Sequence, residues 1–310
     1  MTYITFKYTT MKKMFFLAAA IFMTTCLNAQ IIITGFMANP WGSDNPAKDT
    51  KYKKGSVEIT HDGGYEYIQF MATEDIDFSK TPYSVVTANN GGDRVATANG
   101  WAEGGKTSFK FDLTQGKAAK GTFFYVGSPS KVIAGYHTQG KSADISQANW
   151  IRTIVSNSKS KKVLGDGFGN AIGGTGILGD QYKGDSNEDA DGIAVFKGTK
   201  VSSLTIPIDA IFYGNAIGVT KGEQGVGYIL PTNDHYNNTS GESRFGEPGN
   251  TFFFDQTSPS TNVFIKLGGV YNTEKKNWET PRKAINKKLS GKESTLPDIE
   301  TGMGITQLAP

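Results

Sequence analysis

The sequence predicts an all-β sandwich or barrel. The chain has 38 glycines, which mostly separate short runs rich in valine, isoleucine, phenylalanine, tyrosine and threonine. Such runs are typical of strands, and the glycine-rich connections are typical of turns. Helix signals are scarce, and one short helix is expected over residues 145–156, with Asp144 as its N-cap. Many short strands with few helices indicate a sandwich or a barrel.

The predicted strands can be placed in order along the chain. Residues 31–36 are a continuous apolar run, which indicates a strand buried on both faces. Residues 56–60 alternate between apolar and polar, and Asp-Gly and Gly-Gly pairs over 61–64 supply a turn. Further strands are expected at residues 65–70, 83–88, 107–113, 122–126, 193–196, 206–213, 226–230, 251–254 and 263–267.

The first 29 residues have the pattern of a secretory signal peptide. Translation is expected to start at Met11, which is followed by two lysines and by an apolar run over residues 15–23. We place the cleavage after Ala29, because a small residue at the end of such a segment is typical of a signal-peptidase site. The alternative is lipid anchoring at Cys26, although the residues before it fit that signal poorly. Either way the sequence predicts a secreted or outer-surface protein, with the periplasm as an alternative.

Processing changes the composition of the mature chain. The full chain has 32 basic and 29 acidic residues, and three of its lysines lie in the signal segment, so the mature chain carries 29 of each. A neutral chain gives no general argument for nucleic-acid binding. The one cysteine also lies in that segment, which excludes thiolate catalysis and cysteine-bound metal in the mature protein. No later apolar stretch reaches the length of a membrane span.

The remainder divides into a domain and a tail. Residues 30–285 are expected to form one domain, which carries a long insert at 131–190. The segment 273–292 holds seven basic and two acidic residues and could contact polyanions, or simply be solvated. Residues 286–310 are polar without strong periodicity, so we predict a disordered tail.

The strand order resembles the lamin-tail family, whose members are immunoglobulin-like β-sandwiches found in secreted bacterial proteins and in nuclear lamins. The resemblance is carried by residues 65–70, 77–86, 121–126, 191–196 and 209–214, and residues 278–282 would end the domain. It implies an immunoglobulin-like fold with long glycine-rich loops, an interaction or attachment role, and no catalytic residues. The insert at 131–190 and Gln69, where the family often has an acid, depart from the pattern.

One acidic loop suggests a metal site. Asp185, Asn187, Asp189 and Asp191 place oxygen atoms at alternate positions, as in the first half of a calcium-binding EF-hand loop. The turn glycine and the final glutamate of that motif are missing, so an ordinary solvated loop is the alternative. Calcium is therefore the only cofactor that the sequence suggests.

Other motifs favour ordinary explanations. The glycine pattern at 174–179 matches a dinucleotide fingerprint but leads into no predicted helix. The histidines share no metal-ligand spacing, and the carboxylates near residue 74 mark no glycosidase pair. The tryptophans at 41, 101, 150 and 278 could stack on sugars or could plug the sandwich. We therefore predict a non-catalytic binding or structural module whose partner is a protein or glycan at the cell surface. The alternatives are a calcium-stabilised carbohydrate-binding module and a hydrolase with its site in the insert.

Overall fold

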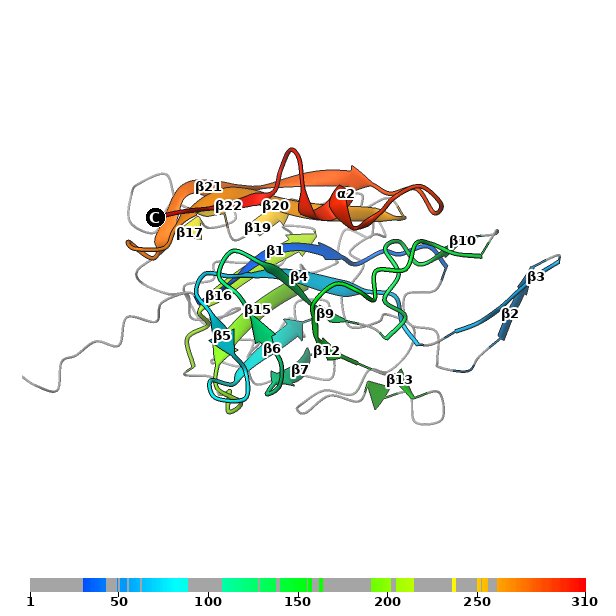
Figure 1. The fold of residues 1–310 in the computed structure, drawn as a ribbon, viewed down its shortest axis with the longest axis horizontal. Helices are drawn as coiled ribbons and strands as arrows, with labels where there is room; N and C mark the ends of the chain where they lie inside the picture. The colour runs from blue at the N-terminus through cyan, green and yellow to red at the C-terminus, as the bar shows by residue number, and fades with distance from the viewer. Residues whose placement is uncertain are drawn as a thin grey trace, which may run out of the picture.

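The structure is a computed structural model, and it confirms an all-β, sandwich-like protein in which two sheets face each other (Figure 1). It describes residues 30–42, 49, 51–54, 56–61, 63–88, 108–127, 129–137, 140–154, 156–157, 162–163, 191–201, 205–214, 236–237, 250–251, 253–255 and 261–310. The predicted signal peptide and the predicted strand at 226–230 lie outside these residues.

The larger sheet has seven strands. Its order is β12 (Trp150–Thr153), β9 (Phe123–Gly127), β4 (Tyr67–Ala72), β1 (Ile31–Met37), β20 (Val263–Asn272) and β21 (Asn277–Lys288), and β22 (Thr306–Ala309) also pairs with β20. Most neighbours are antiparallel, whereas β12 and β22 run parallel to their partners. Every residue of β1 is buried, which confirms the prediction from its continuous apolar run.

The second sheet has five strands, in the order β19 (Phe253–Asp255), β16 (Asp209–Gly214), β15 (Asp191–Lys197), β6 (Tyr83–Ala88) and β7 (Ser108–Leu113). Short pairs complete the described strands: β2 (Lys51–Lys54) with β3 (Val57–Thr60), β5 (Ile76–Asp77) with β8 (Lys117–Ala118), β10 (Tyr136–His137) with β11 (Gly140–Lys141), β13 (Ser156–Asn157) with β14 (Lys162–Val163), and β17 (Tyr236–Asn237) with β18 (Asn250–Thr251). A helix, α2 (Leu296–Glu300), precedes β22.

The main core lies between the two sheets. Alternate residues of each strand point inward, so Ile33 and Phe70 of the large sheet meet Val85 and Ile193 of the small one in a single buried cluster. The large sheet also has buried apolar side chains on its other side, which we call the outer face. These include Tyr67 and Phe264. The outer face is therefore covered by further parts of the chain.

Two predictions about local structure were wrong. Residues 145–156 do not form a helix: the Asp144 carboxylate accepts the backbone N–H of Ser146 in a single turn, and β12 follows. Pairing of β12 with β9 overrides the weak helix signal of this segment. Residues 286–310 are not disordered either: the end of β21 and strand β22 pair with β20, and helix α2 between them packs on the outer face through Ile299. Residues 278–282 accordingly lie inside β21 and do not end the domain.

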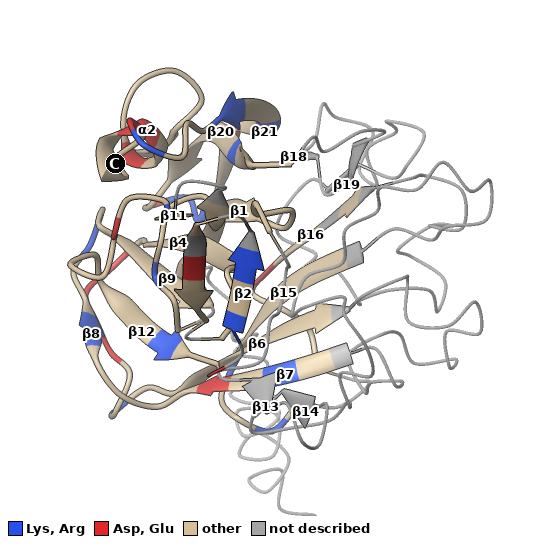
Figure 2. Cartoon of the chain, turned by 90° about the vertical axis from the view of Figure 1, so that its right-hand side faces the viewer, with Lys and Arg blue, Asp and Glu red and all other residues tan. Residues whose placement is uncertain are grey.

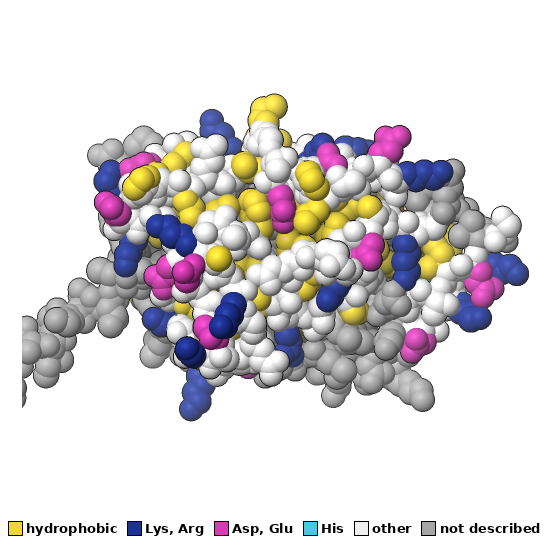
Figure 3. Space-filling view, viewed as in Figure 1, with side chains coloured by type: hydrophobic (Ala, Val, Ile, Leu, Met, Phe, Trp, Pro, Cys, Tyr) yellow, Lys and Arg dark blue, Asp and Glu magenta, His cyan; other side chains and the backbone are white. Residues whose placement is uncertain are grey.

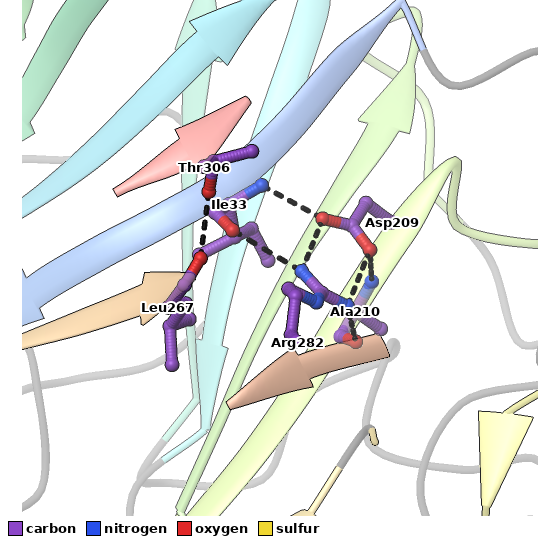
Figure 4. Close-up of polar contacts among 6 residues, drawn as sticks. All are labelled: Ile33, Asp209, Ala210, Leu267, Arg282 and Thr306. Carbon is purple, nitrogen blue, oxygen red and sulfur yellow. Dashed lines mark hydrogen bonds and ion pairs between the residues drawn. The ribbon is translucent and has the colours of Figure 1, made fainter. Parts of the chain in front are cut away.

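A fully buried ion pair joins the two sheets (Figure 4). The Arg282 guanidinium of β21 donates to both carboxylate oxygens of Asp209 in β16, at 2.8 and 2.9 Å, and both residues are at most 1% exposed. The same guanidinium donates to the carbonyls of Ile33 and Ala210, and their N–H groups donate back to Asp209. Both charged groups therefore have backbone hydrogen-bond partners in addition to each other, as a buried ion pair requires.

The position of this pair follows from the strand register. Strand β1 pairs with β20 only at Gly35 and Phe36, because further along β20 turns to pair with β22. Ile33 thus has no partner in β20, and a buried backbone group without a partner is costly. Asp209 and Arg282 supply the missing acceptor and donor.

Candidate functional site

The outer face carries a row of polar and aromatic side chains that crosses the sheet. Residues in register on adjacent strands lie side by side, and the pairing places Trp150 beside Tyr125, and Tyr125 beside Gln69. Gln69 and Lys266 are both in register with Gly35 of the intervening strand, β1. Because Ile68 and Phe70 belong to the core between the sheets, Gln69 points to the outer face. The row therefore runs across β12, β9, β4, β1 and β20.

This row holds the C-terminal segment in place. The end of a helix leaves carbonyl groups without partners inside the helix. Here the Gln69 amide donates to the carbonyl of Ile299 at 3.2 Å, and the Lys266 ammonium donates to the carbonyl of Thr301 at 2.7 Å. The start of the helix is closed by Asp298, whose carboxylate accepts the backbone N–H of Thr295 at 2.9 Å. The buried side chain of Ile299 completes the contact with the sheet.

A chain of hydrogen bonds ends at a carboxyl group on this face. The Thr34 hydroxyl donates to the Gln69 carbonyl oxygen at 3.0 Å, and the Gln69 amide donates to the Tyr125 hydroxyl at 2.9 Å. Tyr125 in turn donates to Glu300 at 2.7 Å. Burial and the nearby Glu300 raise the pKa of Tyr125, so this phenol stays a donor. Burial also raises the pKa of Glu300, and the hydrogen bond from Tyr125 opposes that rise.

Glu300 should give the protein a pH-dependent stability. Its pKa is raised in the folded state, so the folded protein binds more protons than the unfolded chain, and stability falls as pH rises through this window. We expect Glu300→Gln to melt about 1–2 °C above the parent at pH 7, a small shift because the carboxyl is only half-buried. The difference should vanish by about pH 3, where the acid is protonated in both states. Melting curves from pH 3 to 7 test this.

The exposed Glu293 provides the control for that experiment. The variant Glu293→Gln should show no such pH-dependent difference from the parent. An equal pH dependence in the two variants would contradict a special role for the Glu300 carboxyl.

A band of apolar side chains runs across this side of the molecule (Figure 3). On the outer face, Phe123, Trp150 and Leu308 are half-buried and pack on its apolar clusters, and we call these three residues, together with the buried Tyr125 next to Glu300, the outer-face strip. Phe123 and Leu308 pack on the cluster of Ile32, Met71, Tyr271 and Trp278. Half-buried apolar groups that gather in one place on a surface are typical of interaction sites.

The rings in the strip pack against one another and do not form a flat platform. The Trp150 ring lies 5.3 Å from that of Tyr125 at an interplanar angle of 32°, and 5.9 Å from Tyr67 at 69°. The Lys131 ammonium lies 5.7 Å from the centre of the Trp150 ring, and the Trp150 N–H donates to the carbonyl of Ile145. Sugars bind to the open faces of coplanar rings. The rings here are tilted against one another, so their packing favours a ligand that contacts ring edges and apolar side chains.

The predicted calcium ligands are mostly outside the described residues. Asp185, Asn187 and Asp189 lie there, whereas Asp191 begins β15, where it is in register with Tyr213. Within the part of the chain that the structure describes, no three His, Cys, Asp or Glu residues are grouped so that they could hold a metal ion. The calcium hypothesis therefore stays a prediction. The glycine motif at 174–179, which sequence analysis attributes to an ordinary glycine-rich loop, also lies outside the described residues.

The structure places several other candidate residues in local contacts. The His61 ring is buried, 2.8 Å from the Tyr65 hydroxyl. Asp75 accepts the backbone N–H of Lys120, and Asp77 accepts bonds from Ser79. Trp278 is buried, with the Arg282 guanidinium 4.7 Å from its ring. These contacts stabilise turns and packing, so they give none of these residues an evident chemical role.

Sequence reasoning missed three features: the row of side chains across the outer face, the docking of the C-terminal segment, and Lys266 of β20, which binds the Thr301 carbonyl. A Thr295-x-x-Asp298 pattern with a proline between them was the readable signal for α2. Comparison of the chain with protein-family models, with curated proteins and with solved structures gave no match. Within the described residues, no helix has the length and apolar character needed to cross a membrane.

Proposed function

We propose that this chain is an exported, non-catalytic binding module that contacts a protein partner at the cell surface through its outer-face strip. The observation that carries the proposal is that half-buried Phe123 and Trp150 pack on one cluster with the buried Tyr125, and that half-buried Leu308 packs beside Phe123 on the next cluster. The pattern over residues 11–29 supports export. A lamin-tail-like, immunoglobulin-like fold is part of the proposal, since β4, β6, β9, β15 and β16 lie within or overlap the segments that carry that resemblance.

Protein is favoured over glycan by the chemistry of the strip. Interaction sites on proteins combine apolar and aromatic groups with a polar rim, and here Glu300 and Lys131 lie beside the aromatic rings. A cell-surface glycan is the second candidate, because a tryptophan and a tyrosine next to a carboxyl group could bind a sugar through its hydroxyl groups and ring. The hydrolase alternative depends on the insert at 131–190, most of which the structure does not describe.

Site-specific photo-crosslinking tests this proposal. A photoreactive phenylalanine analogue would replace Phe123 or Leu308 in the strip, or the exposed Lys80 away from it as a matched control. The mature protein would then be irradiated on intact cells of the producing organism. We expect adducts at positions 123 and 308 that a protease digests, and none at position 80.

Two results would decide against a protein partner. Adducts that resist protease but are cleaved by periodate would identify a glycan. Equal adduct yields at positions 80, 123 and 308 would show that the strip is not a specific binding surface.

A further inference from the structure

A second feature of this region is a pocket beside α2. It has a volume of about 490 Å³, and β20, β21 and the segment around α2 form its walls. This volume is within the usual range for small-molecule sites, about 300–1,000 Å³. Its lining residues are Lys266, Ile285, Asn286, Lys287, Pro297, Asp298, Thr301, Gly302 and Met303.

Lys266 is the unusual group in this pocket. The residue is only 4% exposed, and its ammonium makes one hydrogen bond, to the carbonyl of Thr301. An ammonium has three donors, and within the described part of the chain Lys266 forms no ion pair. Burial and the nearby Lys287 lower the pKa of Lys266, and Asp298 opposes them. A nearly buried cation without a counter-ion is costly unless something compensates its charge.

Asp298 compensates the Lys266 charge only in part, because its carboxylate is shared with a second lysine. Asp298 forms an ion pair with Lys287 at 2.8 Å and also binds the backbone N–H of Thr295. Two lysines against one aspartate leave the pocket with a net charge of one positive unit. In the cartoon of Figure 2, α2 carries red acidic segments, and β20 and β21 carry blue basic ones. A single negative charge would match this site.

The remaining lining is apolar. Ile285 and Pro297 contribute to the walls, and Met303 at the pocket is 83% exposed, the one large apolar side chain in the described residues with such exposure. An exposed methionine beside a pocket gives an adaptable apolar surface. We propose that this pocket binds a small carboxylate with an apolar group, the carboxylate on Lys266 and Lys287 and the apolar group against Ile285, Pro297 and Met303.

Methyl NMR of methionine-labelled protein tests the proposal with defined probes. Hexanoate is the probe carboxylate, and hexanamide is its neutral counterpart. The Met303 methyl signal, assigned with Met303→Leu, should shift saturably with hexanoate and should not move with hexanamide. The methyl groups of the buried Met37 and Met71 report on folding in every variant.

Three lysine variants test whether hexanoate binding depends on the two lysines of the pocket. Lys266→Gln should weaken hexanoate binding about tenfold or more, because a charge-assisted hydrogen bond is lost. Lys287→Gln should weaken it less, and it also serves if Lys266→Gln does not fold. Lys283→Gln changes an exposed lysine of β21 that does not line the pocket, so binding should be unchanged.

Four outcomes would overturn the assignment. They are no shift of Met303 with hexanoate, an equal shift with hexanamide, an equal loss of binding in Lys283→Gln, or tighter binding of inorganic phosphate than of hexanoate. Because none of these readouts involves Phe123, Trp150 or Leu308, the pocket can fail while the proposed function of the strip stands.

Discussion

Replacing Arg282 with methionine should lower the free energy of unfolding by about 3–5 kcal/mol, because it leaves the Asp209 carboxylate buried and unpaired. Arg282 is completely buried, and its guanidinium donates to both Asp209 oxygens and to the carbonyls of Ile33 and Ala210. The variant also removes the donor that satisfies the carbonyl of Ile33, which has no partner in β20. Urea denaturation at pH 7 measures the loss.

Two comparisons show whether burial causes this effect. The double variant Asp209→Leu, Arg282→Met should recover part of the loss, since no unpaired charge remains in the core. The surface pair of Lys51 and Glu58 has a similar distance, 3.0 Å, but its side chains are 69% and 47% exposed. Lys51→Met should therefore cost no more than about 1 kcal/mol. If Arg282→Met and Lys51→Met lowered the free energy of unfolding equally, the buried ion pair would not stabilise the contact between the sheets.

The second large effect is expected at Ile299. This side chain is fully buried between α2 and the outer face, so Ile299→Ala should lower the free energy of unfolding by about 2–5 kcal/mol, through lost burial and the cavity that remains. Met303, four residues later, is 83% exposed. Met303→Ala should therefore change stability by about 0.5 kcal/mol or less.

The contrast between Ile299 and Met303 tests the docking of the C-terminal segment. Chemical denaturation of the two variants in parallel gives both values under one condition. If Ile299→Ala were as neutral as Met303→Ala, the segment would not contribute to the folded core.

The sequence was a good guide where strands alternate or are wholly apolar. The prediction for 83–88 coincides with β6, and those for 107–113 and 122–126 differ from β7 and β9 by one residue. In these segments local pattern and tertiary pairing agree. In the segment 145–156, Asp144 does start a turn, as a helix cap would. The predicted helix fails because the following residues pair with β9 and form β12.

The C-terminal segment was the main failure, and its cause is physical. Residues 286–310 contain few apolar side chains, so no periodicity marks them. Their order comes from contacts with distant residues: Gln69 and Lys266 bind the end of α2, and Leu267 accepts the Thr306 hydroxyl at 2.6 Å (Figure 4). A single sequence does not show such long-range partners.

The site could be predicted only in part for the same reason. Trp150 was a candidate from composition alone, but the strip also needs Leu308 and Glu300 from the segment that was predicted to be disordered. The pocket needs Lys266 of β20 beside Thr301. The strip combines β9 and β12 with the last fifteen residues, and the pocket combines β20 and β21 with the segment around α2, so only the folded structure brings these parts together.

The docking of residues 289–310 on the outer face is the claim on which both sites depend. Hydrogen exchange of the native protein tests it most directly. Backbone amides of β22 that bond to β20 should exchange about a thousandfold or more slowly than in an unstructured peptide, and the exposed residues 302 and 303 should exchange faster. Uniform, unprotected exchange from residue 290 to 310 would contradict the account, because the strip and the pocket would then have no C-terminal wall.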